Sequence, residues 1–115
     1  MKKLNDFPVL IFLLLCLLVL QAPMYAQDCG CDITFDASEK PNHFLNGNHT
    51  PVNPGDVICI KGGTYTYIRI INIHGTKEKP IIIKNCDGQV KIDLTNQNNH
   101  GFVMNYSTHF RVTGT

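Results

Sequence analysis

The run Pro54-Gly55-Asp56-Val57-Ile58-Cys59-Ile60-Lys61-Gly62-Gly63-Thr64-Tyr65 decides the fold of this 115-residue chain. Its first two residues predict a turn, and Asp56 can satisfy the turn amides with its carboxylate. The apolar residues that follow alternate, as they do in a strand with one buried face. Two glycines then allow a sharp corner, because glycine adopts a positive φ without strain. We expect Tyr65 to lie across this corner with its hydroxyl in solvent.

Short apolar segments recur after this run about every 20 residues, a period that is typical of solenoid proteins. Turn residues separate them, and no helical periodicity is present, so the sequence predicts an all-β solenoid in which each coil adds one strand to each parallel sheet. A small antiparallel sandwich is the alternative, and the constant phase of the apolar pairs favours the solenoid. The two interleaved series are Ile58/Ile60, Ile81/Ile83 and Phe102/Met104, and Ile68/Ile70, Val90/Ile92 and Phe110/Val112.

The same residues carry a resemblance to a known group of proteins. The pattern P-G-D-x-I-x-I of residues 54–60, followed by Gly63-Thr64-Tyr65 and by the G-T-x-x-x-P-I pattern of residues 75–81, resembles the opening of secreted right-handed parallel β-helix proteins. This group includes chondroitinase-B-like, alginate-lyase-like and pectate-lyase-like proteins, and the resemblance covers residues 51–115. It implies a right-handed parallel β-helix, polysaccharide-lyase-like activity, and calcium as a cofactor of the complete protein.

The N-terminus predicts export. Met1-Lys2-Lys3 is a positive leader, and the apolar stretch from Pro8 to Leu20 is too short to span a bilayer, which is typical of a secretory signal. We place cleavage after Ala26; an uncleaved anchor is the alternative. The predicted organisation is a signal peptide at 1–26, an N-terminal cap segment at 27–50 and the first coils of the β-helix at 51–115. We expect a secreted bacterial protein, extracellular or periplasmic, with no membrane span after cleavage.

Four cysteines remain after cleavage: Cys29, Cys31, Cys59 and Cys86. In an oxidising compartment they allow three full pairings. A metal site at Cys29-Gly30-Cys31 is the alternative, but its one-residue spacing is shorter than that of zinc knuckles. The outward positions of the first series are the apolar Cys59, Ile82 and Val103, which the cap segment is expected to cover. We therefore predict a disulfide from Cys29 or Cys31 to Cys59.

The charge distribution bears on the partner. The chain after the predicted cleavage carries eight basic and eight acidic side chains, which argues against nucleic acid. The outward positions of the second series are Arg69, Lys91 and Arg111, and stacked strands would bring these cations into a ladder about 4.8 Å apart. The ladder predicts an acidic polysaccharide as the partner; neutralisation by nearby acids is the alternative. Replacing Lys91 should then weaken binding more than replacing Lys77.

No catalytic, cofactor-binding or metal-ligating residues are assigned from the sequence. The five histidines lack metal-binding spacing, so we expect them in loops or turns. The chain stops directly after a strand, and we expect it to be the first part of a longer protein. Two functions stay open: a secreted β-helix that binds or cleaves acidic polysaccharide, or a non-catalytic extracellular module for adhesion. Whether the protein is an enzyme is left open.

Overall fold

The computed structural model describes Ile11, residues 29–95 and residues 101–114, and the structural statements below concern these residues. The predicted signal peptide lies outside them, apart from Ile11. The strands, in chain order, are β1 (Ile33–Phe35), β2 (Asn42–Asn46), β3 (Val57–Tyr65), β4 (Tyr67–Ile71), β5 (Ile81–Ile92), β6 (Phe102–Asn105) and β7 (Phe110–Thr113). No helix among the described residues is long and apolar enough to cross a membrane.

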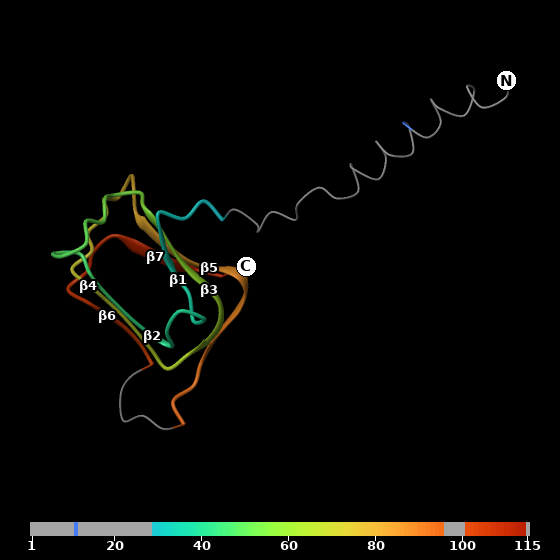
Figure 1. The fold of residues 1–115 in the computed structure, drawn as a ribbon. Helices are drawn as coiled ribbons and strands as arrows, with labels where there is room; N and C mark the ends of the chain where they lie inside the picture. The colour runs from blue at the N-terminus through green and yellow to red at the C-terminus, as the bar shows by residue number, and fades with distance from the viewer. Residues whose placement is uncertain (1–10, 12–28, 96–100, 115) are drawn as a thin grey trace, which may run out of the picture.

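The strands form two parallel sheets, and the chain passes from one to the other at every step. One sheet has the order β1-β3-β5-β7 and the other the order β2-β4-β6. Every pairing within them is parallel. Seen along the coil, the chain winds around a central core in successive turns (Figure 1). The predicted β-solenoid is therefore confirmed, since a sandwich of hairpins would pair its neighbouring strands in antiparallel fashion.

The segment that we assigned to the N-terminal cap also contributes the first coil. Ile33 of β1 pairs with Ile58 of β3, and His43 of β2 pairs with Ile68 of β4, so the first coil is offset from the second by the same length of chain in both sheets. The turn between β1 and β2 curls inside the ring (Figure 1). The first coil thus forms both edge strands and part of the cover at this end of the core.

The two predicted series of apolar pairs do not match the observed strand pairing. Ile68 of β4 pairs with Phe102 of β6, and Ile83 of β5 pairs with Val112 of β7, so both of these steps are longer than the predicted period. Val90 and Ile92, which we placed in a separate strand, belong to the end of the 12-residue β5. Asp87 and Gly88 have positive φ values and form a bend within β5. The prediction was wrong here because the chain continues β5 after this bend instead of starting a strand in the other sheet.

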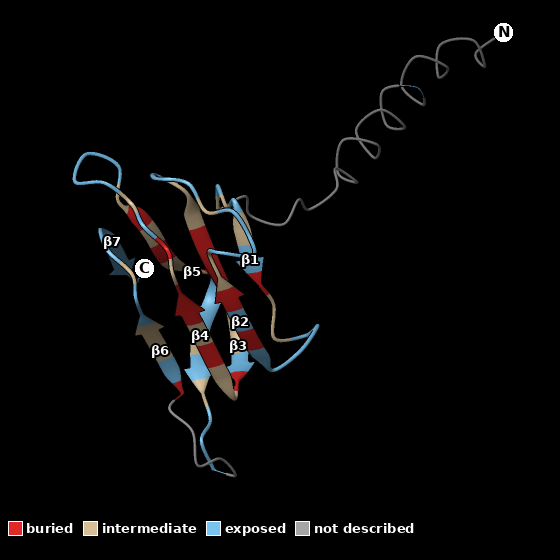
Figure 2. Ribbon diagram, turned by 90° about the vertical axis from the view of Figure 1, so that its left-hand side faces the viewer, coloured by how far each residue is buried: buried red, intermediate tan, exposed pale blue. Residues whose placement is uncertain are grey.

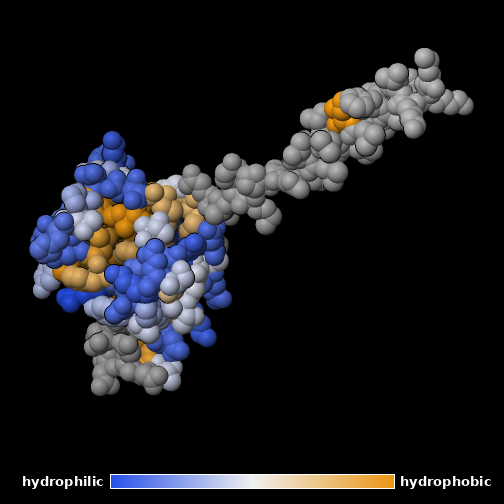
Figure 3. All heavy atoms as spheres, in the orientation of Figure 1, coloured by the Kyte–Doolittle hydropathy of each residue, from blue (hydrophilic) through white to orange (hydrophobic). Residues whose placement is uncertain are grey.

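Isoleucine dominates the core between the sheets. Alternate residues of each strand point inward, as the burial pattern of β4 shows (Figure 2). Seen along the coil, hydrophobic residues lie toward the middle of the end that faces the viewer, with hydrophilic residues around them (Figure 3). Six isoleucines are almost completely inaccessible to solvent: Ile58, Ile68, Ile70, Ile73, Ile81 and Ile83.

Two corners depend on special backbone positions. Gly63 has a φ of 153° at the irregularity of β3, which confirms the expected use of a glycine there. At the corner after the β2-β4-β6 sheet, Asn72 adopts a φ of 56° and donates its side-chain amide to Asn46 Oδ1 at 3.0 Å. A Cβ on Gly47 would collide with the Asn72 carbonyl oxygen. Successive coils therefore stack in direct contact at this corner.

The interior opens at the end formed by the last strands. Phe102 and Phe110 each keep 36% of their surface exposed, although their positions face the core. A cavity of about 680 Å³ lies between these strands and β5. Ile60, Ile83, Val90, Phe102 and Val112 supply its apolar lining.

Candidate functional site: the outer face of the β2-β4-β6 sheet

The outer face of the β2-β4-β6 sheet is turned toward the viewer in Figure 2. Residues at odd and even positions of a strand point to opposite faces, so the neighbours of buried His43, Ile68 and Ile70 point outward. The outward positions that keep part of their surface accessible are Asn42, Phe44, Asn46, Tyr67, Arg69, Val103 and Asn105, whereas Ile71 at the end of β4 is buried. Aromatic, amide and aliphatic side chains thus surround a single cation, Arg69.

Three of these residues lie side by side across the sheet. Phe44 of β2 pairs with Arg69 of β4, which pairs with Val103 of β6. The Arg69 Cζ atom lies 5.6 Å from the centre of the Phe44 ring, close enough for a cation–π contact. Phe44 keeps 55% of its surface exposed, so the ring orders the guanidinium without removing both from solvent. We call this row, together with Tyr67, the Arg69 face.

The charge of Arg69 has no acidic partner among the described residues. The single ion pair that they form joins Lys61 to Asp36, at 3.5 Å, and the outward positions of the Arg69 face hold no carboxylate. In addition, Arg69 Nε is buried and has no hydrogen-bond partner in the described part of the chain. A buried donor without a partner is costly. The residue as a whole is only partly buried, so a ligand on this face would meet the rest of the guanidinium and not the Nε atom.

The predicted ladder of cations is not one row. Arg69 lies in the β2-β4-β6 sheet, whereas Lys91 pairs with Thr64 and Arg111 pairs with Ile82 in the other sheet. Within that sheet they also lie at different heights, because Lys91 follows the bend of β5 and Arg111 lies opposite the start of β5. The ladder was derived from the wrong strand pairing, and its three residues cannot act together on one face.

The cysteines form two disulfides, Cys29–Cys86 and Cys31–Cys59. The predicted tie from the N-terminal segment to Cys59 is therefore confirmed, with Cys31 as the partner. Cys59 is completely buried although its position points away from the core, because the chain before β1 crosses the outer face of β3 and β5. The two bonds join the first coil to both following coils, and they indicate an oxidising, extracellular-type environment.

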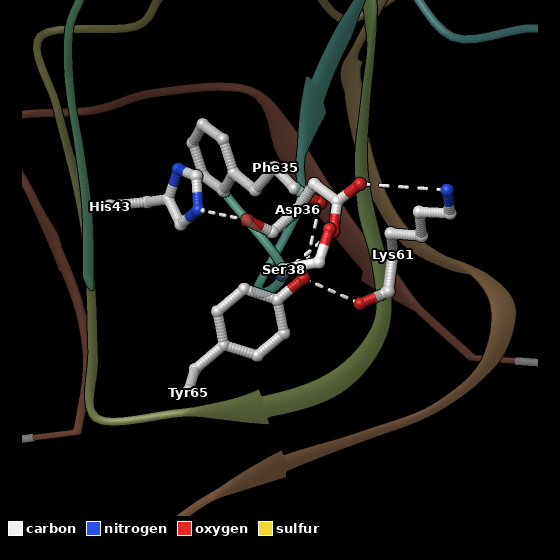
Figure 4. A network of polar contacts seen from close by, with 6 residues as sticks. All are labelled: Phe35, Asp36, Ser38, His43, Lys61 and Tyr65. Atoms are coloured by element: carbon white, nitrogen blue, oxygen red, sulfur yellow. Dashed lines mark hydrogen bonds and ion pairs between the residues drawn. The ribbon is translucent and has the colours of Figure 1, made fainter. Parts of the chain in front are cut away.

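A polar network inside the ring holds the first coil against the second (Figure 4). The Tyr65 hydroxyl lies 3.1 Å from the Phe35 carbonyl oxygen and 2.5 Å from that of Lys61. Tyr65 is completely buried, so the expectation of a solvated hydroxyl was wrong, and burial raises the pKa of this hydroxyl. His43 Nε2 donates to the Asp36 carbonyl oxygen at 3.0 Å, which places this histidine in the core and not in a loop.

The carboxylate of Asp36 belongs to the same network (Figure 4). The Ser38 hydroxyl and amide both donate to Asp36 Oδ1, at 2.7 and 2.9 Å. The hydroxyl bond is the main cause that lowers the pKa of Asp36, and Lys61 adds to it. Because this pKa is depressed, the contribution of the carboxylate to stability is lost only as the pH falls through the lowered value. The network therefore stabilises the first turn.

Sequence reasoning missed the role of Phe44. This residue was placed in the cap, where it was expected to cover apolar surface, whereas it points outward beside Arg69. The register reveals it, because His43 and Leu45 align with Ile68 and Ile70, and no local pattern in the sequence gives that alignment. That alignment places Phe44 opposite Arg69.

Comparison of the chain with protein-family models, with curated proteins and with solved structures finds no match in any of the three.

Proposed function

We propose that this protein is a secreted β-solenoid that binds acidic polysaccharide on the Arg69 face. The observation that supports this most directly is the guanidinium of Arg69, ordered over the Phe44 ring and left without an acidic partner among the described residues. The planar fork of arginine matches a carboxylate with two parallel hydrogen bonds. A uronate carboxylate supplies the missing counter-charge.

The shape of the face suits a polymer. Neighbouring strands lie about 4.8 Å apart, so a sheet presents a shallow surface that an extended chain can cross. Phe44 and Tyr67 offer aromatic surface for the apolar side of a sugar ring, and the exposed Asn42 amide borders them with a donor and an acceptor. Secretion from a bacterium, inferred from the leader, and the disulfide-bonded state both fit a ligand outside the cell.

Replacing Arg69 by glutamine tests this proposal. We expect the variant to bind polygalacturonate or alginate oligosaccharides about 10- to 100-fold more weakly than the unchanged protein, since hydrogen bonds to charged groups contribute roughly 1.5 to 3 kcal/mol. Lys91→Gln is the matched control, because it removes the same charge from an exposed strand position elsewhere and should leave binding unchanged. Isothermal titration calorimetry measures both.

Two results would contradict the proposal. One is an equal loss of affinity in the Arg69 and Lys91 variants, which would mean that net charge alone attracts the polymer. The other is affinity that does not fall as the salt concentration rises, since contacts at an exposed face are screened. Neutral dextran serves as the ligand control and should not bind.

A lyase is a second candidate, favoured by the position of Tyr67. This residue lies two positions before Arg69 on β4 and on the same outer face, so a cation and a hydroxyl lie next to each other. By resemblance, β-helix lyases neutralise a uronate carboxylate and remove the neighbouring proton with a basic side chain. If the protein is a lyase, Tyr67→Phe should abolish the formation of unsaturated uronate products while it preserves binding. An unchanged protein that binds without forming such products is a binding module.

A further inference from the structure

We propose that the four cysteines, once reduced, form a thiolate site for one soft divalent cation such as Zn²⁺ on the outer face of the β1-β3-β5-β7 sheet. The inference does not depend on the Arg69 face, which belongs to the other sheet. It rests on three features: the positions of the sulfur atoms, the backbone that presents them, and the cations beside them.

The sulfur atoms are already gathered by the fold. The Sγ atoms of Cys29, Cys31 and Cys86 all lie within 4.8 Å of one another, although Cys31 is bonded to neither of the other two. Tetrahedral zinc with Zn–S bonds of about 2.3 Å needs sulfurs roughly 3.8 Å apart, so shifts of about 1 Å bring three thiolates around one ion. The Cys59 sulfur lies outside this group but is bonded to the Cys31 sulfur, so it would complete the site through a larger shift than the other three.

The backbone explains how so short a motif reaches one point. Gly30 adopts a φ of 67° between Cys29 and Cys31, a conformation that other residues rarely take. Both neighbouring cysteines reach the same outer sheet face, where they bond to Cys86 of β5 and Cys59 of β3. The one-residue spacing between Cys29 and Cys31 is too short for a zinc knuckle. In the folded chain it nevertheless places both sulfurs beside that of Cys86, which comes from another coil.

Two lysines stand next to the strand cysteines. In the register between β3 and β5, Cys59 lies opposite Lys84, and Cys86 lies opposite Lys61. These four residues share the outward face, so each cysteine has a cation as its cross-strand neighbour. Positive charge beside a thiol favours the thiolate, which is the form that binds metal. Lys84 offsets part of the net negative charge of a site with four thiolates and one divalent ion, whereas Lys61 also pairs with Asp36.

The reaction balances with an external reductant. Each protein disulfide accepts two electrons and two protons and becomes two thiols; a phosphine supplies the electrons and takes up the oxygen of water as its oxide. Binding of the cation then releases four protons, one from each thiol. The protein would therefore hold the disulfides in an oxidising environment and the metal in a reducing one.

Metal titration of the reduced protein tests the proposal. The full chain is reduced with a water-soluble phosphine without oxygen, and Cd²⁺ or Zn²⁺ is added. We expect one equivalent to bind, with thiolate-to-cadmium charge-transfer absorption that saturates at that ratio. Bound metal should also protect all four thiols from alkylation, which mass spectrometry counts. The oxidised protein should show none of this.

Variants separate the site from adventitious binding. Cys86→Ser should weaken binding about 100-fold or more, because one thiolate ligand is lost. His74→Ala is the matched control: it removes an exposed potential ligand that contacts Thr108 away from the cysteines, and binding should be unchanged. Circular dichroism of each reduced variant shows whether its strands remain.

Three outcomes would overturn the proposal. The first is binding that saturates at one equivalent but is insensitive to Cys86→Ser. The second is alkylation of all four thiols at the same rate with and without metal. The third is a reduced protein that loses its strands and does not regain them when the ion is added, since the site requires the register of β3 and β5.

Discussion

Replacing Cys29 and Cys86 together by alanine is expected to lower the free energy of unfolding by about 4 kcal/mol. The reason is that their disulfide spans 57 residues of sequence, so it removes a large amount of conformational entropy from the unfolded chain. It also joins the first coil directly to the third, across β3. Urea denaturation of the two oxidised proteins measures the difference.

The control for this comparison is the same pair of proteins in a phosphine reductant. Both then lack the bond, and we expect the difference in the free energy of unfolding to fall below about 1 kcal/mol. A large difference that survives reduction would show that the cysteines stabilise the fold through packing and not through the disulfide.

Ile58→Ala is expected to cost about 3 to 4 kcal/mol of stability, because the substitution leaves a cavity in the centre of the solenoid. Ile58 is completely buried in β3 and pairs with Ile33 on one side and Ile83 on the other. Ile82→Ala removes the same atoms from an outward, partly exposed position of β5 and should cost about 1 kcal/mol or less. Thermal unfolding followed by circular dichroism compares the two, and equal losses would contradict the observed register.

The general fold follows from the sequence because its signals are local. Alternation of apolar residues marks a strand and its buried face within a few residues, and the glycines of residues 62–63 mark a corner in the same way. The tie between the N-terminal segment and Cys59 was also predictable, since an apolar outward stripe needs a cover. These features require no knowledge of how far apart paired strands lie in the chain.

Pairing across coils was not predictable, because it depends on how long the connections are. The step from Ile68 of β4 to Phe102 of β6 is longer than the step from Ile58 of β3 to Ile83 of β5, and the extra residues lie in the connection after β5. The sequence pattern cannot distinguish this insertion from a shift to the other sheet. The same error displaced the candidate site, since it placed Lys91 beside Arg69 and left Phe44 in a cap.

The position of Tyr65 shows a second limit. The local sequence allows the Tyr65 hydroxyl to lie in solvent, because the residue follows a corner. The turn after β1 covers it and removes it from water. The Phe35 carbonyl oxygen that accepts its hydrogen bond lies 30 residues earlier in the chain. Contacts of this kind come from the stacking of coils and have no local signature.

The most direct test of the proposed glycan-binding face is the NMR signal of the Arg69 Nε–H group. This donor is buried and has no partner among the described residues, so its proton reports on the state of the guanidinium and should shift when a carboxylate pairs with the accessible part of that group. Titration with a short uronate oligosaccharide is predicted to move this signal together with the backbone amides of Phe44, Arg69 and Val103. Shifts confined to Lys91 and Arg111, or an Arg69 signal that stays in place while the ligand binds, would contradict the proposed face.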